Sequence, residues 1–201
     1  VLARASHGGE STLIFDDARK TVSKTTDRKT TKPFELVVTD VFGPAEVSSK
    51  DGNRYCISFI DVHTRFARIY FMKRKSEDLE RTKQFIAEVG KPGSLLCESG
   101  VDTIRNDEGG EYTSHEYAKF CRENRISREC TAPCTPEWNG IAERYWQTIL
   151  NSARCMLKKS GLPKEFWVRA VDTAVYIRNR CITAPLNKSP YESMFGKKGR
   201  F

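Results

Sequence analysis

Three acidic residues, Asp40, Asp107 and Glu143, stand at positions where separate secondary-structure elements are expected to begin or end. Asp40 ends the apolar run 34–39, Asp107 ends a second apolar run, and Glu143 opens the longest helical pattern in the chain, with 35 residues between it and Asp107. Carboxylate oxygens are hard ligands that suit Mg²⁺ or Mn²⁺. Acids from different elements can surround two such ions, which activate a nucleophile and stabilise the leaving oxygen in a phosphoryl transfer.

This hypothesis requires that the strands before Asp40 and Asp107 be neighbours in one sheet. Taken singly, each acid is also compatible with an ordinary turn or capping role. The hydrophobic and turn patterns predict strands at 34–42, 54–60 and 65–72, a helix at 76–89, a strand at 101–106, a helix at 114–122, an extended segment at 126–131, helices at 140–159 and 163–180, and an irregular tail from 184. This order predicts an α/β fold, a mixed sheet flanked by helices.

The helix expected from Gly140 is amphipathic in a way that bears on function. Its polar face continues from Glu143 through Gln147, Asn151, Arg154 and Lys158, at helical spacing. A helix with its apolar side in the core could lay this face along a phosphate backbone. An ordinary amphipathic surface helix is the alternative interpretation of the same pattern.

Positive charge is concentrated in the last third of the chain. The formal net charge is +8. Residues 140–201 contain 12 Lys and Arg against 4 Asp and Glu, whereas residues 1–139 contain 22 of each. A basic segment beside a carboxylate cluster suggests that a polyanion is brought to a metal site. The alternative is a solvated basic tail.

The seven cysteines do not form a metal-binding pattern. Cys130 and Cys134 are the only close pair, and no histidine lies near them, so no zinc is expected in this chain. Buried or partly buried thiols in a reducing compartment are the preferred interpretation. No apolar run approaches the roughly 18 residues that cross a bilayer, and no membrane partner is expected.

The chain divides into a short, a long and a very short segment. Residues 1–32 lack hydrophobic periodicity and are predicted to be a linker or a degenerate N-terminal segment. Residues 33–196 would form one catalytic core including its C-terminal helices, followed by a tail at 197–201. Because the sequence begins at Val1, we expect it to be part of a longer polypeptide.

Ordered motifs around the three acids resemble the catalytic core of retrotransposon integrases, most closely of the Ty1/copia type. They comprise Thr39-Asp-Val-Phe-Gly-Pro44, Arg105-Asn-Asp-Glu-Gly-Gly-Glu-Tyr112 and Thr135-Pro-Glu-Trp-Asn-Gly-Ile-Ala-Glu-Arg144, and continue through Ala153-Arg-Cys-Met-Leu157, Leu162-Pro-Lys-Glu-Phe-Trp167, Ala174-Val-Tyr-Ile-Arg-Asn-Arg180 and Ser189-Pro-Tyr-Glu192. The 35-residue spacing matches the family's D,D-35-E pattern. The resemblance covers roughly 33–196.

The resemblance implies an RNase H-like fold, a five-stranded mixed sheet with helices on both faces. It implies that Asp40, Asp107 and Glu143 bind two Mg²⁺ or Mn²⁺ ions, and that the protein first trims the 3′ ends of element DNA and then joins them to target DNA. The implied partners are DNA, further copies of this chain on that DNA, and other segments of a Pol polyprotein. The implied site of action is the nucleus, after synthesis in the cytoplasm.

The sequence also departs from the family pattern. The family's N-terminal His/Cys zinc module has no counterpart here, since His7 is the only histidine before position 63 and no cysteine precedes Cys56. Trp138 could stack on a distorted base or anchor its loop, and with Asn139 it joins the residues that we expect to contact DNA. Two alternatives remain: a domesticated core that binds DNA or a protein without cutting, and a related DDE-type nuclease or transposase.

Overall fold

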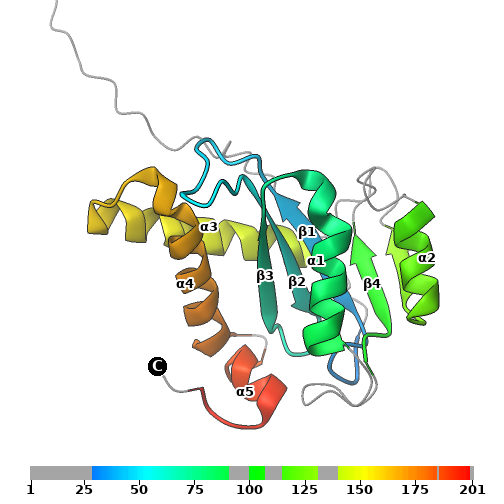
Figure 1. The fold of residues 1–201 in the computed structure, drawn as a ribbon. Helices are drawn as coiled ribbons and strands as arrows, with labels where there is room; N and C mark the ends of the chain where they lie inside the picture. The colour runs from blue at the N-terminus through cyan, green and yellow to red at the C-terminus, as the bar shows by residue number, and fades with distance from the viewer. Residues whose placement is uncertain (1–28, 91–99, 107–114, 131–139, 185, 200–201) are drawn as a thin grey trace, which may run out of the picture.

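The structure is a computed structural model that describes residues 29–90, 100–106, 115–130, 140–184 and 186–199 (Figure 1). The strands are β1 (Val37–Phe42), β2 (Tyr55–Asp61), β3 (Ala67–Met72), β4 (Thr103–Asn106) and β5 (Ser127–Cys130). The helices are α1 (Asp78–Phe85), α2 (His115–Glu123), α3 (Gly140–Ser160), α4 (Trp167–Arg180) and α5 (Pro190–Phe195).

The five strands form one mixed sheet in the order β3-β2-β1-β4-β5. β1 pairs antiparallel with β2 and β2 with β3, whereas β4 runs parallel to β1 and β5 parallel to β4. β1 is therefore the central strand, and its neighbour β4 is the strand that leads to Asp107. β1 and β4 are neighbours, which is the condition that the three-acid hypothesis sets, and the predicted mixed sheet and α/β class are confirmed.

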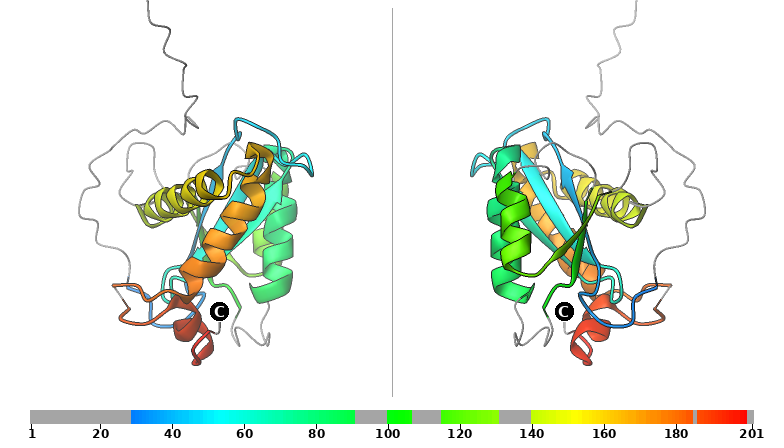
Figure 2. Two further views of the ribbon diagram at one scale, coloured as in Figure 1. Left: turned by 90° about the vertical axis from the view of Figure 1, so that its left-hand side faces the viewer. Right: turned by 90° about the vertical axis from the view of Figure 1, so that its right-hand side faces the viewer.

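Helices cover both faces of the sheet, with α3 and α4 on one side and α1 and α2 on the other (Figure 2). The central strand is apolar on both faces: Val38 packs with residues of α3 and α4, and Val37 packs with residues of α1 and α2. Both side chains are fully buried. Because successive residues of a strand point to opposite faces, one apolar run supplies both cores.

The α1 side of the sheet is packed by aromatic rings. Phe59 of β2 stacks on Phe85 of α1, with ring centroids 4.3 Å apart and planes at 6°, and Phe34 meets Phe85 edge-on at 6.2 Å. Such rings bury large apolar areas and fix the helix against the sheet. This core packs against the face of the sheet opposite to the one that α3 covers.

The irregular tail predicted from residue 184 is wrong, because α5 forms within it. Ser189 is the N-cap, its hydroxyl oxygen accepting a hydrogen bond from the Glu192 backbone N–H at 3.0 Å, and Pro190 occupies the first turn. The ring of Phe195 meets Phe66 edge-on at 5.4 Å. A short helix that packs in this way does not show a long hydrophobic period, so the pattern did not reveal it.

Candidate functional site

Asp40 lies on the face of β1 that α3 covers. Its neighbours two positions away, Val38 and Phe42, both belong to the packing between the sheet and α3, and the ring of Phe42 lies 5.6 Å from that of Trp146. Because side chains alternate along a strand, Asp40 shares this face. It is half-buried. The sheet therefore presents a carboxylate at its centre, beside the first turns of α3.

A hydrogen bond ties the backbone of Asp40 to the adjoining strand. Asp40 pairs with Ser58 of β2, whose hydroxyl donates a hydrogen bond to the Asp40 carbonyl oxygen at 3.3 Å. Burial, and then the nearby Asp40 carboxylate, raise the pKa of the Cys56 thiol well above its ordinary value. Cys56 is consequently a neutral, buried thiol. Cys121 is also buried, as expected, whereas Cys155 and Cys181 are exposed, so the expectation of buried thiols is wrong for these two.

Gly43 ends the Asp40 strand for a steric reason. Its φ is +128°, a conformation that favours glycine, and an added Cβ would lie 2.7 Å from both the Arg54 carbonyl oxygen and the Tyr55 ring. The close approach lets β1 turn directly into the loop before β2. The glycine after Asp40 in the sequence motif thus has a structural role rather than a chemical one.

Glu143 lies in the first turn of α3 and is half-buried. It comes one residue after Ala142 and three before Trp146, which are both buried against the sheet face that carries Asp40. The apolar residues on either side of the two acids therefore hold strand and helix together. Asp40 and Glu143, which are 103 positions apart in the sequence, come from neighbouring elements on the same face.

Asp107, the third predicted acid, lies outside the described residues. The strand before it is described: β4 ends at Asn106, and Arg105 pairs in parallel register with Val38. Asp107 follows Arg105 by two positions, as Asp40 follows Val38 by two. Parallel strands present their carboxyl ends at one edge of a sheet. The register of β1 and β4 is thus the one that the three-acid hypothesis requires.

An ion pair that the sequence did not reveal supports this part of the sheet. Arg105 donates to one oxygen of Glu129 on β5 from Nε at 3.0 Å and from Nη2 at 2.8 Å. The Arg105 side chain is only 7% exposed and that of Glu129 28%. Strand pairing alone brings these residues together across 24 positions, so no local spacing could have indicated the pair. It fixes the end of β4 immediately before Asp107.

The predicted DNA-contact residues divide between described and undescribed positions. Gln147, Asn151 and Lys158 are exposed along α3 and Arg154 is half-buried, so the polar face forms as expected. Trp138 and Asn139 lie outside the described residues. The opposite side of α3 is packed in the core at 141, 145, 149 and 153, which confirms the amphipathic pattern.

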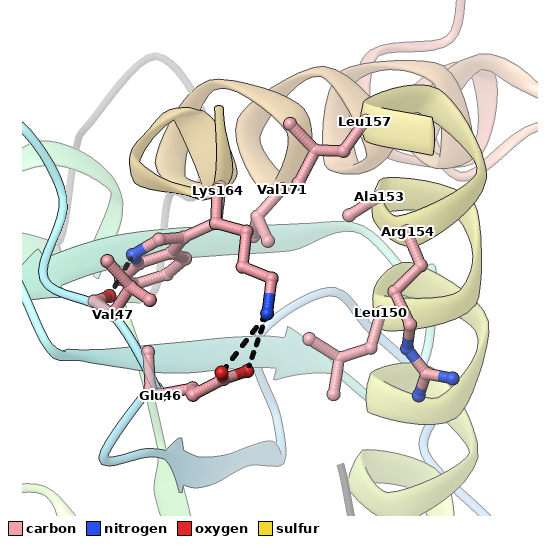
Figure 3. A pocket seen from close by; sticks show the side chains of 10 residues that line it. Glu46, Val47, Leu150, Ala153, Arg154, Leu157, Lys164 and Val171 are labelled. Atoms are coloured by element: carbon pink, nitrogen blue, oxygen red, sulfur yellow. Dashed lines mark hydrogen bonds and ion pairs between the residues drawn. The ribbon is translucent and has the colours of Figure 1, made fainter. Parts of the chain in front are cut away.

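Arg154 lies beside a small apolar pocket between α3, α4 and the loop after β1 (Figure 3). The pocket holds about 20 Å³, which is room for about one water molecule. Lys164 and Glu46 form an ion pair at 3.1 Å across it, and the indole N–H of Trp167 donates to the Val47 carbonyl oxygen at 3.0 Å. These contacts join α4 to the loop, and the pocket is too small for a ligand.

The described residues contain neither a side-chain cluster suited to a metal ion nor a helix suited to a membrane. No group of three or more His, Cys, Asp or Glu side chains gathers there in a way that could hold a metal ion, although Asp107 and Cys134 lie outside those residues. None of the helices in the described part of the chain is both long and apolar enough to span a membrane.

Comparisons with a family model and with known sequences indicate the same protein family. The model of the integrase core domain matches residues 30–136. A retrovirus-related Pol polyprotein from transposon TNT 1-94 of Nicotiana tabacum is 37% identical over 175 residues, which are 86% of this chain and 13% of that protein. The Ty1-NL2 Gag-Pol polyprotein of Saccharomyces cerevisiae is 31% identical over 160 residues, covering 79% of this chain and 9% of that protein. The chain thus spans only about an eighth or less of the length of these relatives.

Two solved structures illustrate the similarity in fold. The chain superposes on a chain of the simian T-cell lymphotropic virus intasome, solved in complex with the PP2A regulatory subunit B56 gamma, with a TM-score of 0.69 and 16% identity, covering 89% of this chain and 60% of that one. The HTLV-2 integrase catalytic core domain in complex with magnesium gives a TM-score of 0.60 at 20% identity, covering 81% and 97%. At these identities the likeness establishes the fold.

Proposed function

The chain belongs to the integrase core domain family and has its RNase H-like fold, and on this premise we propose that it trims and joins DNA ends by metal-dependent polynucleotidyl transfer. The observation that carries the proposal is the position of two acids: Asp40 belongs to the face of the central strand that α3 covers, and Glu143 belongs to the first turn of α3. β4, the neighbour of that strand, ends one residue before Asp107.

The residues at this point fit a divalent metal. Carboxylates are the hard oxygen donors that Mg²⁺ and Mn²⁺ prefer, and both described acids are half-buried beside an apolar core. Asp40, Asp107 and Glu143 would hold two ions, which supply nucleophile activation and stabilise the leaving oxygen. The HTLV-2 core that shares this fold was solved with magnesium.

The same site would serve two reactions, because each breaks and forms one P–O bond. In end trimming, a water oxygen attacks phosphorus and the strand's 3′ oxygen leaves and takes up a proton. In joining, the freed 3′-hydroxyl loses its proton and attacks a target phosphodiester, whose own 3′ oxygen leaves. Gln147, Asn151 and Lys158 would bind the DNA backbone and hold it in line with the acids.

The wider context of the reaction is also part of the proposal. The relatives are Pol polyproteins of transposons, so this segment would act on the DNA of such an element and on host DNA in the nucleus. One of the structures with this fold is part of an intasome. We therefore expect several copies of the chain to assemble on the DNA ends.

The direct test is strand transfer of a labelled element-end oligonucleotide into plasmid DNA, with Mn²⁺ and with EDTA. We expect joined products with Mn²⁺ only. Glu143→Gln removes one carboxylate charge and should lower joining by at least about 10²-fold, a typical size for a group that acts in the transition state. The matched control is Glu165→Gln, the same change at an exposed position before α4, which should leave joining unchanged.

Two results would contradict the proposal. Joining that persists in EDTA would show that the reaction needs no divalent metal. Joining that persists in Glu143→Gln would show that Glu143 is not part of the catalytic site. Salt-sensitive DNA binding without joining, in a chain extended by its flanking segments, would instead favour the non-catalytic binding module.

A further inference from the structure

A cavity of about 280 Å³ lies against the side of α3 that faces α4 and α5, and three arginines line it. Arg65 comes from the turn between β2 and β3, Arg144 from the first turns of α3 and Arg178 from the last turn of α4. Neither Asp nor Glu is among the described residues that line it. A concave surface with concentrated positive charge attracts anions.

Two of these arginines are available to a ligand. Arg144 is exposed and Arg178 is half-buried. Within the described part of the chain, neither guanidinium forms an ion pair or a hydrogen bond with another side chain. In contrast, Arg105 pairs with Glu129 and Arg81 with Glu77. The charges of Arg144 and Arg178 are therefore not neutralised by another side chain of the described residues.

Two of the residues that line the same cavity carry buried hydroxyl groups. Tyr145 is 7% exposed and Thr183 is 3% exposed. Their hydroxyl oxygens are buried, and neither forms a hydrogen bond with any described protein group. A buried hydroxyl without a partner is unfavourable, so such groups in a polar cavity mark places where a ligand can complete the bonding.

The polar groups at the cavity are hydrogen-bond donors. The Tyr145 O–H, the Thr183 O–H and the guanidinium N–H groups can all donate, and a multiply charged oxyanion accepts such a set of bonds.

We propose that this cavity binds a terminal phosphate group, from a free phosphate compound or from the 5′-phosphorylated end of a DNA strand. A phosphate monoester carries nearly two negative charges and three acceptor oxygens, and guanidinium groups bind it in a bidentate geometry. A terminal group presents three acceptor oxygens to these donors, whereas a phosphodiester is continued by the chain on both sides. The cavity is formed by the opposite flank of α3 from the acids, and the proposal holds whether or not the chain transfers DNA.

The first experiment is calorimetric titration of the 201-residue chain with inorganic phosphate in EDTA at fixed ionic strength. We expect saturable binding at one site. Arg178→Gln should weaken it by about tenfold or more, as expected for loss of a charged hydrogen-bonding partner. Arg169→Gln, on an exposed position of the same helix outside the cavity, makes the same charge change and should leave affinity within about twofold.

Tyr145→Phe provides a second variant that removes only the hydroxyl. It should weaken phosphate binding by about threefold to tenfold, the usual effect of one hydrogen bond. Thermal melting of each variant shows whether it folds. Absence of saturable phosphate binding by the wild-type chain overturns the proposal. Equal weakening by Arg178→Gln and Arg169→Gln also overturns it, because that result indicates only general surface charge.

The source of the phosphate is distinguished with two oligonucleotides of one sequence, one 5′-phosphorylated and one with a 5′-hydroxyl. Tighter binding of the phosphorylated strand, with the difference abolished by Arg178→Gln, identifies a DNA end as the ligand. Phosphate binding without such a difference identifies a free phosphate compound. These binding measurements require neither a metal ion nor DNA joining. A negative result would therefore contradict the phosphate-binding proposal without bearing on the proposed transfer reaction.

Discussion

Asn179 should be one of the most sensitive positions for stability, because it connects α4 to the edge of the sheet. Its side-chain oxygen accepts a hydrogen bond from the Ala67 N–H at 3.0 Å, and its amide nitrogen donates to the Ala67 carbonyl oxygen at 2.8 Å. Asn179 is 5% exposed and Ala67 is fully buried. One side chain therefore satisfies both backbone groups at the start of β3.

Asn179→Ala removes both bonds and leaves two buried backbone groups without these partners. Each lost bond costs about 1 kcal/mol, and each unsatisfied buried group adds a further cost of similar size. The better helix propensity of alanine returns about 0.5 kcal/mol. We therefore expect a net loss of about 3.5 kcal/mol, which lowers the melting temperature by roughly 7–14 °C for a domain of this size.

The assay is urea unfolding followed by far-UV circular dichroism, with thermal melting as a second readout. The control is Asn151→Ala, the same change at an exposed position of α3, which should alter stability by less than about 0.5 kcal/mol. An Asn179→Ala variant within about 0.5 kcal/mol of wild type would refute the reasoning, since it would mean that water replaces the side chain at little cost.

Three further predictions follow from single residues. Asp61 accepts hydrogen bonds from Phe34 and Thr64, yet burial raises its pKa above the ordinary value of 3.8. The contribution of Asp61 to stability is therefore complete below about pH 3.8 and falls as pH rises through the pKa of the folded state. In urea titrations the free energy of unfolding of wild type minus that of Asp61→Asn should be larger at pH 3.5 than at pH 7, and a difference that grows with pH contradicts this sign. Lys158→Gln should weaken DNA binding and lower the slope of log K against log salt by about one unit if it meets one phosphate, whereas an unchanged slope in fluorescence anisotropy removes it from the DNA path. Asp107→Asn should abolish joining while leaving the melting temperature within a few degrees of wild type, and activity near the wild-type level would exclude this residue from the metal site.

Much of the fold could be predicted from local patterns. The apolar runs around Val38 and Ile104 indicated buried strands, and the spacing of Ile141, Tyr145 and Ile149 indicated the core side of α3; both are confirmed. These patterns depend only on the 2.0- and 3.6-residue periods of strands and helices, which each segment carries in itself. Short elements contain too few periods for a pattern to be recognised, and for this reason α5 was not predicted.

The sequence by itself determined which chemistry is available: three carboxylates at element ends, a polar helix face after Glu143 and an excess of basic residues after position 140. Only the tertiary structure decided which side chains meet. The Arg105–Glu129 pair depends on the β4–β5 register, and the cavity with Tyr145, Arg178 and Thr183 depends on how α4 and α5 pack beside α3. Such contacts join residues far apart in the chain, and their partners are set by strand order and helix packing, which no local period encodes.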